Sequence, residues 1–211
     1  MRITKINPRY EHWRSFIGSV PDIFEQEGKE IYNKRNLIKM LTAPDGTAVN
    51  VKRYHVPHGP NRLVYSWGIR KPKCQRAFDY PMILKNKGIE TPEPIAIIEE
   101  RNWLGLLGYS YLITMQCDYG HTLYEVGDAK AGTYETLAKA LAHFAAKIHN
   151  GNVLHKDFTP GNVLWKQDDE GFHFSLVDIN RMHFGQVSAK QGLYNLRKFW
   201  GPKEFIRIMV T

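Results

Sequence analysis

Alternation of apolar and polar residues predicts a first half that is rich in β-strands. Between residues 29 and 54, the runs KEIY, LIKML and AVNVKRY are typical of short strands, and NKRN and TAPDGT separate them as turns. In the third run, Val49 and Val51 share one face and Lys52 lies on the other. Two further strands, IAIIEE and YSYLITM, are expected before residue 116.

A helix is expected between these strand regions, and helices become dominant later in the chain. One helix is expected within residues 73–87, with a break or a restart at Pro81, because proline lacks the N–H that continues a helix. The turn formers of residues 55–72 indicate a connection.

The second half of the chain carries the strongest helical pattern. TYETLAKALAHFAAKIHNG (133–151) places apolar residues about 3.6 positions apart and ends at Gly151, which predicts a helix. AKQGLYNLRKFW (189–200) predicts a final helix. Between the two lie the short apolar runs VLH, NVLW and FHFSLV, each bounded by turns.

The change of pattern near QCDYG predicts an α+β fold with two lobes. Residues 1–115 are expected to form a small lobe with an antiparallel sheet and one helix. Residues 116–120 would be a hinge, and residues 121–211 a short, mainly helical second lobe.

Composition indicates the compartment in which the protein is expected. The only two cysteines of the 211 residues, Cys74 and Cys117, are far apart, so no disulfide framework is expected and a reducing compartment such as the cytoplasm is favoured. The N-terminus has no apolar core of a signal peptide. The longest apolar stretch, residues 103–115, falls short of the ~20 residues that a membrane span needs.

The net charge of +8 has two readings. It is either a solvated basic surface with no specific role or an attraction to an anionic partner, such as ATP, a phosphorylated saccharide or an anionic lipid head group. The basic residues are scattered, as in RKPKCQR, and do not alternate with aromatic residues on one face. A nucleic-acid-binding module is therefore not expected.

The candidate chemistry lies in HKDFTPGN (155–162) and in the later FSLVDIN, which ends at residue 180. Together they match the H-x-D-x-x-x-x-N loop and the following metal-binding aspartate of kinase-like phosphotransferases. Transfer of a phosphoryl group needs a magnesium ion held by hard oxygen donors, and Asn162 and Asp178 supply these. Asp157 would face the incoming hydroxyl and accept its proton.

Each of these residues has a simpler reading when taken alone. Asp157 and Asn162 are common turn residues, and Asp178 can cap a helix. His155 is expected to bond the backbone in either case. The order and spacing of the set favour the catalytic reading, because the separate structural roles do not predict them together.

At this level the chain resembles the lipopolysaccharide kinase family, bacterial kinases that phosphorylate Kdo or heptose sugars of the inner core. It also shares the broader pattern of aminoglycoside-type phosphotransferases. The resemblance rests on VLHKDFTPGNVLW, FSLVDINRMHFG, GIETPEPIA and YLITM. It implies a protein-kinase-like fold that uses ATP and Mg²⁺.

The resemblance also implies roles for individual residues. Lys52 matches the strand lysine that binds the α- and β-phosphates, and Asp79 is the candidate for its acidic partner. The hinge, with Gln116 and Cys117, would give backbone hydrogen bonds to adenine. Asp157 matches the catalytic aspartate, and Asn162 and Asp178 match the metal ligands.

Several features depart from the protein-kinase pattern. The loop of residues 33–36 lacks the glycines that clasp phosphates, so Lys34 or Arg35 would have to substitute. Thr159 stands where protein serine/threonine kinases keep a lysine. Few residues follow Asp178, which favours a small hydroxyl acceptor over a docked peptide.

The sequence therefore predicts an ATP- and magnesium-dependent kinase for a sugar hydroxyl, with a glycolipid of the lipopolysaccharide inner core as acceptor. Its positive charge would allow peripheral association with an anionic membrane surface. A minimal protein serine/threonine kinase and a nucleotide-binding pseudokinase without turnover are the alternatives.

Overall fold

The computed structural model describes the chain except for residues 35, 131 and 211. The chain divides into two compact units. The first contains Met1–Pro81 and Pro92–Cys117, and the second contains Met82–Thr91 and Asp118–Thr211. Each unit is described separately.

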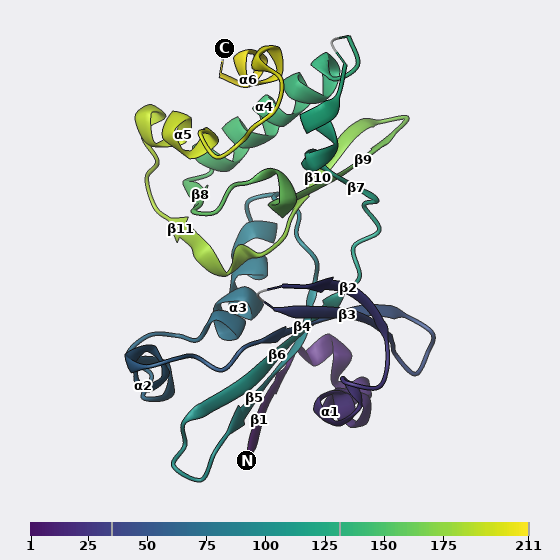
Figure 1. The fold of residues 1–211 in the computed structure, drawn as a ribbon, viewed down its shortest axis with the longest axis vertical. Coiled ribbons are helices and arrows are strands. Elements are labelled where there is room, and N and C mark those ends of the chain that lie inside the picture. The colour runs from purple at the N-terminus through teal and green to yellow at the C-terminus, as the bar shows by residue number, and fades with distance from the viewer. Residues whose placement is uncertain (35, 131, 211) are drawn as a thin grey trace. The chain divides into compact units, whose positions relative to one another are not determined.

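A six-stranded antiparallel sheet forms the framework of the first unit (Figure 1). Its strands lie in the order β1-β5-β6-β4-β3-β2, so the first strand of the chain is at one edge. The strands are β1 (Arg2–Ile6), β2 (Lys29–Asn33), β3 (Leu37–Thr42), β4 (Ala48–Tyr54), β5 (Pro94–Arg101) and β6 (Leu107–Met115). The five strands expected from the sequence are thereby confirmed.

One face of this sheet packs against α1 (Arg14–Ile23). The alternation in β4 explains the packing, since Val49 and Val51 are fully buried in the same apolar cluster as Ile17 and Val20 of the helix. This cluster is the larger core of the first unit. Neither β1 nor α1 was predicted from the sequence.

The opposite face packs against α3 (Lys73–Lys85). Ile97 and Leu112 from the sheet lie in one cluster with Cys74 and Phe78 of the helix. The expected helix is confirmed, but the expected break at Pro81 is wrong, because the helix continues through this residue. Phe78, which lies nearly one turn before the proline, is buried in this cluster and anchors the helix where one backbone hydrogen bond is missing.

The segment expected to be an irregular connection is partly helical. It contains α2 (Pro60–Ser66), which begins with a proline after Gly59. Gly59 has a φ of +53°, a conformation that suits glycine and marks the start of the helix. Residues 55–72 therefore connect β4 to α3, as predicted, but the prediction did not include the helix within them.

The second unit combines three helices with short strands. The helices are α4 (Glu135–Asn150), α5 (Ala189–Leu196) and α6 (Lys203–Val210), and the strands are β7 (His121–Thr122), β8 (Val153–His155), β9 (Val163–Asp168), β10 (Gly171–Leu176) and β11 (Met182–Phe184). The 3₁₀ turns of the unit are η2 (Leu123–Asp128), η3 (Pro160–Asn162) and η4 (Ile179–Arg181), and η1 (Pro8–Trp13) belongs to the first unit. The predicted helix of residues 133–151 is confirmed as α4, and α5 confirms the first part of the predicted final helix.

Two small antiparallel sheets carry the loops of the second unit. β9 lies between β10 and β7, and β8 pairs with β11. The core beneath them includes the periodic face of α4, with Leu141 and Ile148 almost fully buried. No helix among residues 1–34, 36–130 and 132–210 is long and apolar enough to cross a membrane.

Candidate active site

The catalytic motif predicted from the sequence forms the loop between β8 and β9 in the second unit. His155 ends β8, and Asp157 follows in the turn that leads to η3. Asn162 ends η3 immediately before β9, and Asp178 follows β10 after one further residue. The antiparallel pairing of β9 with β10 therefore returns the chain, as expected from the sequence, to the place where Asn162 lies.

His155 connects the two halves of the motif through its imidazole ring. Its Nδ1 accepts a hydrogen bond from the Asp157 backbone N–H at 3.1 Å, and its Nε2 lies 3.1 Å from the Val177 carbonyl oxygen. Since the Asp157 N–H is a donor, the ring proton must be on Nε2, where it is donated to Val177. The expectation that His155 bonds the backbone is confirmed.

The same histidine is held in its neutral form. Its side chain is fully buried, and burial lowers its pKa below the ordinary value. The hydrogen bond to Val177 and the charges of Asp178 and Asp157 offset this effect only in part. A neutral ring is also what the bond geometry needs, because a protonated imidazole cannot accept the Asp157 N–H.

Asn162 provides a second connection across the motif. Its side-chain Nδ2 donates to the Asp157 carbonyl oxygen at 2.8 Å, and its own carbonyl accepts the Val177 N–H at 3.0 Å. The residue before Asp178 is thus bonded directly to Asn162. The two candidate metal ligands are brought together by backbone contacts.

The donor set at this point fits a magnesium ion. The Nδ2 bond leaves the amide oxygen of Asn162 as the atom able to coordinate, and Asp178 adds a carboxylate. Asp178 adopts a left-handed φ of +52° and accepts a hydrogen bond from the side chain of Asn180. The buried Oδ1 of Asn180 has no hydrogen-bond partner among the residues that the structure describes, so this corner is rich in oxygen acceptors.

Asp157 forms an ion pair that the sequence did not reveal. Lys198 Nζ lies 2.7 Å from Asp157 Oδ1 and 2.8 Å from the Lys156 carbonyl oxygen. Burial alone would raise the pKa of the Asp157 carboxyl, but the Lys198 ammonium more than compensates, with a smaller contribution from Arg181. The pKa is therefore lowered, and the carboxylate is ionised near neutral pH.

The residues next to Lys198 in sequence also contact the loop that contains Asp157. Asn195 at the end of α5 donates from Nδ2 to the His155 carbonyl oxygen at 2.9 Å. Phe199 packs edge-on against Phe158, with ring centroids 4.8 Å apart. No spacing rule in the sequence links these residues to the loop, since only the fold of the C-terminal segment brings them there.

Lys52, the predicted phosphate-binding lysine, lies in β4 of the first unit. It is opposite Leu112 of β6, which in turn is opposite Ile97 of β5, so it shares the face of the sheet that α3 covers. Its Nζ lies 5.1 Å from the centre of the Tyr54 ring. This placement agrees with the face that the alternation predicted, and its role stays a prediction.

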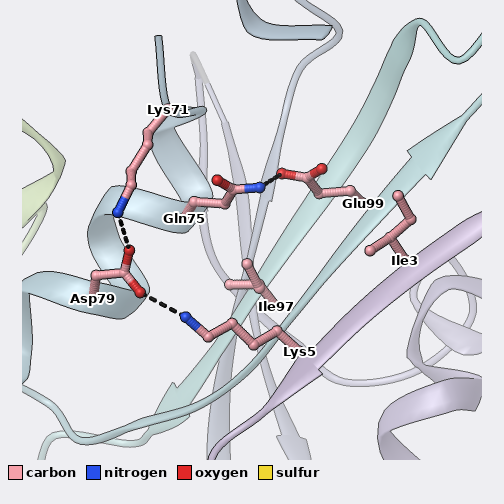
Figure 2. A pocket seen from close by; sticks show the side chains of 7 residues that line it. All are labelled: Ile3, Lys5, Lys71, Gln75, Asp79, Ile97 and Glu99. Atoms are coloured by element: carbon pink, nitrogen blue, oxygen red, sulfur yellow. Dashed lines mark hydrogen bonds and ion pairs between the residues drawn. The ribbon is translucent and has the colours of Figure 1, made fainter. Parts of the chain in front are cut away.

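Asp79, the candidate partner of Lys52, lies in a pocket of about 260 Å³ between β1, β5 and α3 (Figure 2). Its two carboxylate oxygens pair with Lys5 at 2.8 Å and Lys71 at 3.1 Å. Burial alone would raise the pKa of the Asp79 carboxyl. The ammonium groups of Lys5 and Lys71 together have the larger, opposite effect, so the pKa is lowered. These lysines neutralise the carboxylate, and its pairing with Lys52 stays a prediction.

The hinge candidates lie where the chain leaves the sheet. The Gln116 backbone N–H donates to the Ala48 carbonyl at 3.2 Å, and its side-chain oxygen accepts from Asn50 at 3.1 Å. Its Nε2 donates to the Cys117 carbonyl at 3.1 Å. An adenine contact of either residue stays a prediction. In the glycine-free loop, Lys34 is exposed and Arg35 lies outside the described residues.

Comparison with known proteins identifies a family for the chain. The model of the lipopolysaccharide kinase (Kdo/WaaP) family matches residues 28–199. No curated protein sequence matches the chain.

Solved structures with a similar fold include a WaaP complex and a Rio2 kinase complex. A structure of WaaP in complex with acyl carrier protein has 16% identity and a TM-score of 0.53, covering 94% of this chain and 79% of that one. The Rio2 kinase–ADP/Mg²⁺–phosphoaspartate complex from Chaetomium thermophilum has 13% identity and a TM-score of 0.57, covering 95% and 59%. The predicted α+β, protein-kinase-like fold is confirmed.

Proposed function

Since the chain belongs to the lipopolysaccharide kinase (Kdo/WaaP) family and is a kinase, we propose that it transfers the γ-phosphoryl group of ATP to a sugar hydroxyl of a lipopolysaccharide inner-core glycolipid. The observation that carries the proposal is the bonding of His155 to both the Asp157 amide and the Val177 carbonyl. This one ring orders the base and the metal-binding aspartate together.

In the proposed reaction, Asp157 orients the acceptor hydroxyl and removes its proton. The acceptor oxygen forms a bond to the γ-phosphorus, the bond from that phosphorus to the β,γ-bridging oxygen breaks, and ADP leaves. Lys198 occupies Oδ1 of Asp157, so Oδ2 is the oxygen that receives the proton. The lowered pKa of Asp157 keeps it ionised and ready to accept.

Asn162 and Asp178 would hold Mg²⁺ through an amide and a carboxylate oxygen, and Lys52 would bind the α- and β-phosphates. When bound, the ion would neutralise charge on the phosphate oxygens. The described carboxylate and amide donors are the type that Mg²⁺ prefers. In this proposal the lobe of residues 1–115 and the hinge of residues 116–120 bind the nucleotide. The lobe of residues 121–211 carries the catalytic and metal-binding loops.

The proposed roles predict separable effects. Asp157→Asn should lower kcat about 10²- to 10⁴-fold, the usual contribution of a general base, and leave ATP affinity nearly unchanged. Asp178→Asn should instead weaken nucleotide binding in the presence of Mg²⁺. Asp169→Asn is the matched control, because Asp169 is exposed in the turn between β9 and β10.

The test is transfer from labelled ATP to Kdo, heptose, deacylated inner-core oligosaccharide and generic protein acceptors. Phosphorylation of a saccharide that depends on Asp157 supports the proposal. Phosphorylation of protein alone would favour the minimal protein kinase, and nucleotide binding without any transfer would favour the pseudokinase. Loss of ATP affinity in Asp157→Asn would contradict the role given to that residue.

A further inference from the structure

Two half-exposed aromatic rings lie beside the catalytic loop of the second unit. Tyr124 belongs to η2, and Trp200 follows α5. Their ring centroids are 5.5 Å apart with an angle of 41° between the planes, and the residues are 53% and 50% exposed. Large aromatic groups in contact with each other usually bury more of their surface than this.

Glycines allow both rings to lie directly on the backbone. A Cβ at Gly161 would be 2.5 Å from Tyr124 Cε2, and a Cβ at Gly127 would be 2.3 Å from Trp200 Cζ3. Both distances are too short for a real side chain, so any other residue would displace the rings. Gly161 lies between Asp157 and Asn162, and Tyr124 is therefore in contact with the catalytic loop itself.

Trp200 is positioned by its chain neighbours. Lys198 binds the Asp157 carboxylate, and Phe199 is buried against Phe158 of the same loop. Trp200 follows immediately and leaves the core. Two independent segments, η2 and the segment after α5, thus bring an exposed aromatic ring to the loop that holds the proposed base.

We propose that Tyr124 and Trp200 form a platform for a sugar ring of the acceptor, an inference that rests on the proposed kinase function. A pyranose has an apolar C–H face and a hydroxyl-bearing edge, and the electron-rich face of an aromatic ring can cover the former. Stacking would leave the hydroxyls free for Asp157. Lys198 Nζ has three N–H groups, of which two are in the bonds to Asp157 and Lys156, and the third can serve an acceptor oxygen.

The platform predicts a selective loss of acceptor binding. Trp200→Ala and Tyr124→Ala should each raise the acceptor KM about tenfold and change the ATP KM less than twofold. Trp200→Phe and Tyr124→Phe, which keep an aromatic face, should recover most of the affinity. Trp103→Ala is the control, because Trp103 is 90% exposed in the β5–β6 loop of the first unit.

Steady-state kinetics with saturating ATP and varied deacylated inner-core oligosaccharide measure these effects, and thermal midpoints show that each variant is folded. An unchanged acceptor KM in the alanine variants would overturn the platform while the proposed function stands. A raised ATP KM with an unchanged acceptor KM would identify a nucleotide contact and also overturn it. If the alanine variants kept the wild-type KM for the oligosaccharide but no longer bound vesicles, the rings would be a membrane contact and the platform would be wrong.

Binding without ATP separates the platform from the kinase reaction. The oligosaccharide should alter the Trp200 indole N–H signal in an NMR titration of the wild type, with Trp200→Phe identifying the signal. Saccharide binding without any transfer would support the platform and contradict the proposed function. Absence of both binding and transfer would overturn both.

Discussion

At the scale of single residues, the Lys198–Asp157 ion pair controls the charge of the proposed base. Lys198→Met removes the ammonium that lowers the Asp157 pKa, so this pKa should rise. The base is active when ionised, and its acidic limb in the pH dependence of kcat/KM should therefore move to higher pH. Lys198→Arg keeps the charge, so its acidic limb should lie close to that of the wild type.

The ion pair should matter more for catalysis than for folding. Both side chains are 34% exposed, so solvent screens the pair, and its loss should cost less than about 1 kcal/mol of folding free energy. Lys190→Met in α5 removes an exposed lysine of the same segment and is the control. A pH profile of Lys198→Met that superimposes on the wild type would show that Lys198 does not tune Asp157.

His155 provides a prediction about stability and pH. Its pKa is lowered in the folded state by burial, so the unfolded chain binds the proton more strongly. Stability from this residue is complete above the ordinary histidine pKa of about 6.5 and is lost as the pH falls from there towards the folded pKa. We expect the free energy of unfolding of the wild type to decrease over this window.

His155→Ala should reduce this dependence and lower stability near pH 7.5 by about 2–4 kcal/mol. The substitution leaves a cavity and removes the partners of the Asp157 N–H and the Val177 carbonyl. Denaturant unfolding at several pH values measures both effects. His58→Ala, at an exposed histidine, should leave the curve unchanged. An equal slope in His155→Ala and the wild type would mean that other groups cause the acid sensitivity.

The candidate site was predictable where its residues share a local motif. Asp157, Asn162 and Asp178 lie within one loop and the following hairpin, so sequence spacing was enough to group them. Lys198 and Asn195 reach the same loop only through the packing of α5. Neither residue type nor spacing marks them out, because lysine and asparagine are ordinary surface residues.

At the scale of elements, the periodicity of apolar residues predicted the helices and strands that bury one face. β4 and α4 alternate with the correct period because one side of each lies in a core. β1 was missed because four of its five residues are exposed, so no apolar face is visible in RITKI. α6 was also unassigned, although Phe205 and Met209 are buried on one side, since its eight residues give too short a pattern.

Pro81 gives an element-scale prediction, because α3 continues through it. Pro81→Ala supplies the N–H that can bond the Ala77 carbonyl and removes the ring that crowds it. The variant should be about 1–3 kcal/mol more stable, which corresponds to a rise in Tm of several degrees for a chain of this size.

A matched control tests whether position decides the effect. Pro202 immediately precedes α6, where a missing N–H costs nothing, so Pro202→Ala should be neutral or slightly destabilising. Calorimetry of the two variants gives the comparison. A lower Tm for Pro81→Ala would show that the backbone at this position is adapted to proline.

At the scale of the whole molecule, the charge of +8 predicts attraction to anionic membrane surfaces. Each basic residue close to such a surface contributes about 1 kcal/mol, and the effect is limited to roughly the Debye length, about 8 Å at physiological salt. The protein should therefore sediment with vesicles that contain the anionic lipid phosphatidylglycerol. It should not sediment with phosphatidylcholine alone.

Salt and charge reversal decide whether this attraction is electrostatic. Binding should decrease at least tenfold when the ionic strength rises from about 0.05 to 0.5 M, because the Debye length shortens several-fold. Lys139→Glu and Lys190→Glu, at two exposed lysines, should weaken binding if the charge acts as a whole, and Asp169→Asn should strengthen it slightly. Equal binding to neutral and anionic vesicles, or binding that salt does not affect, would mean that the positive charge serves only solubility and that the acceptor is brought to the enzyme by other contacts.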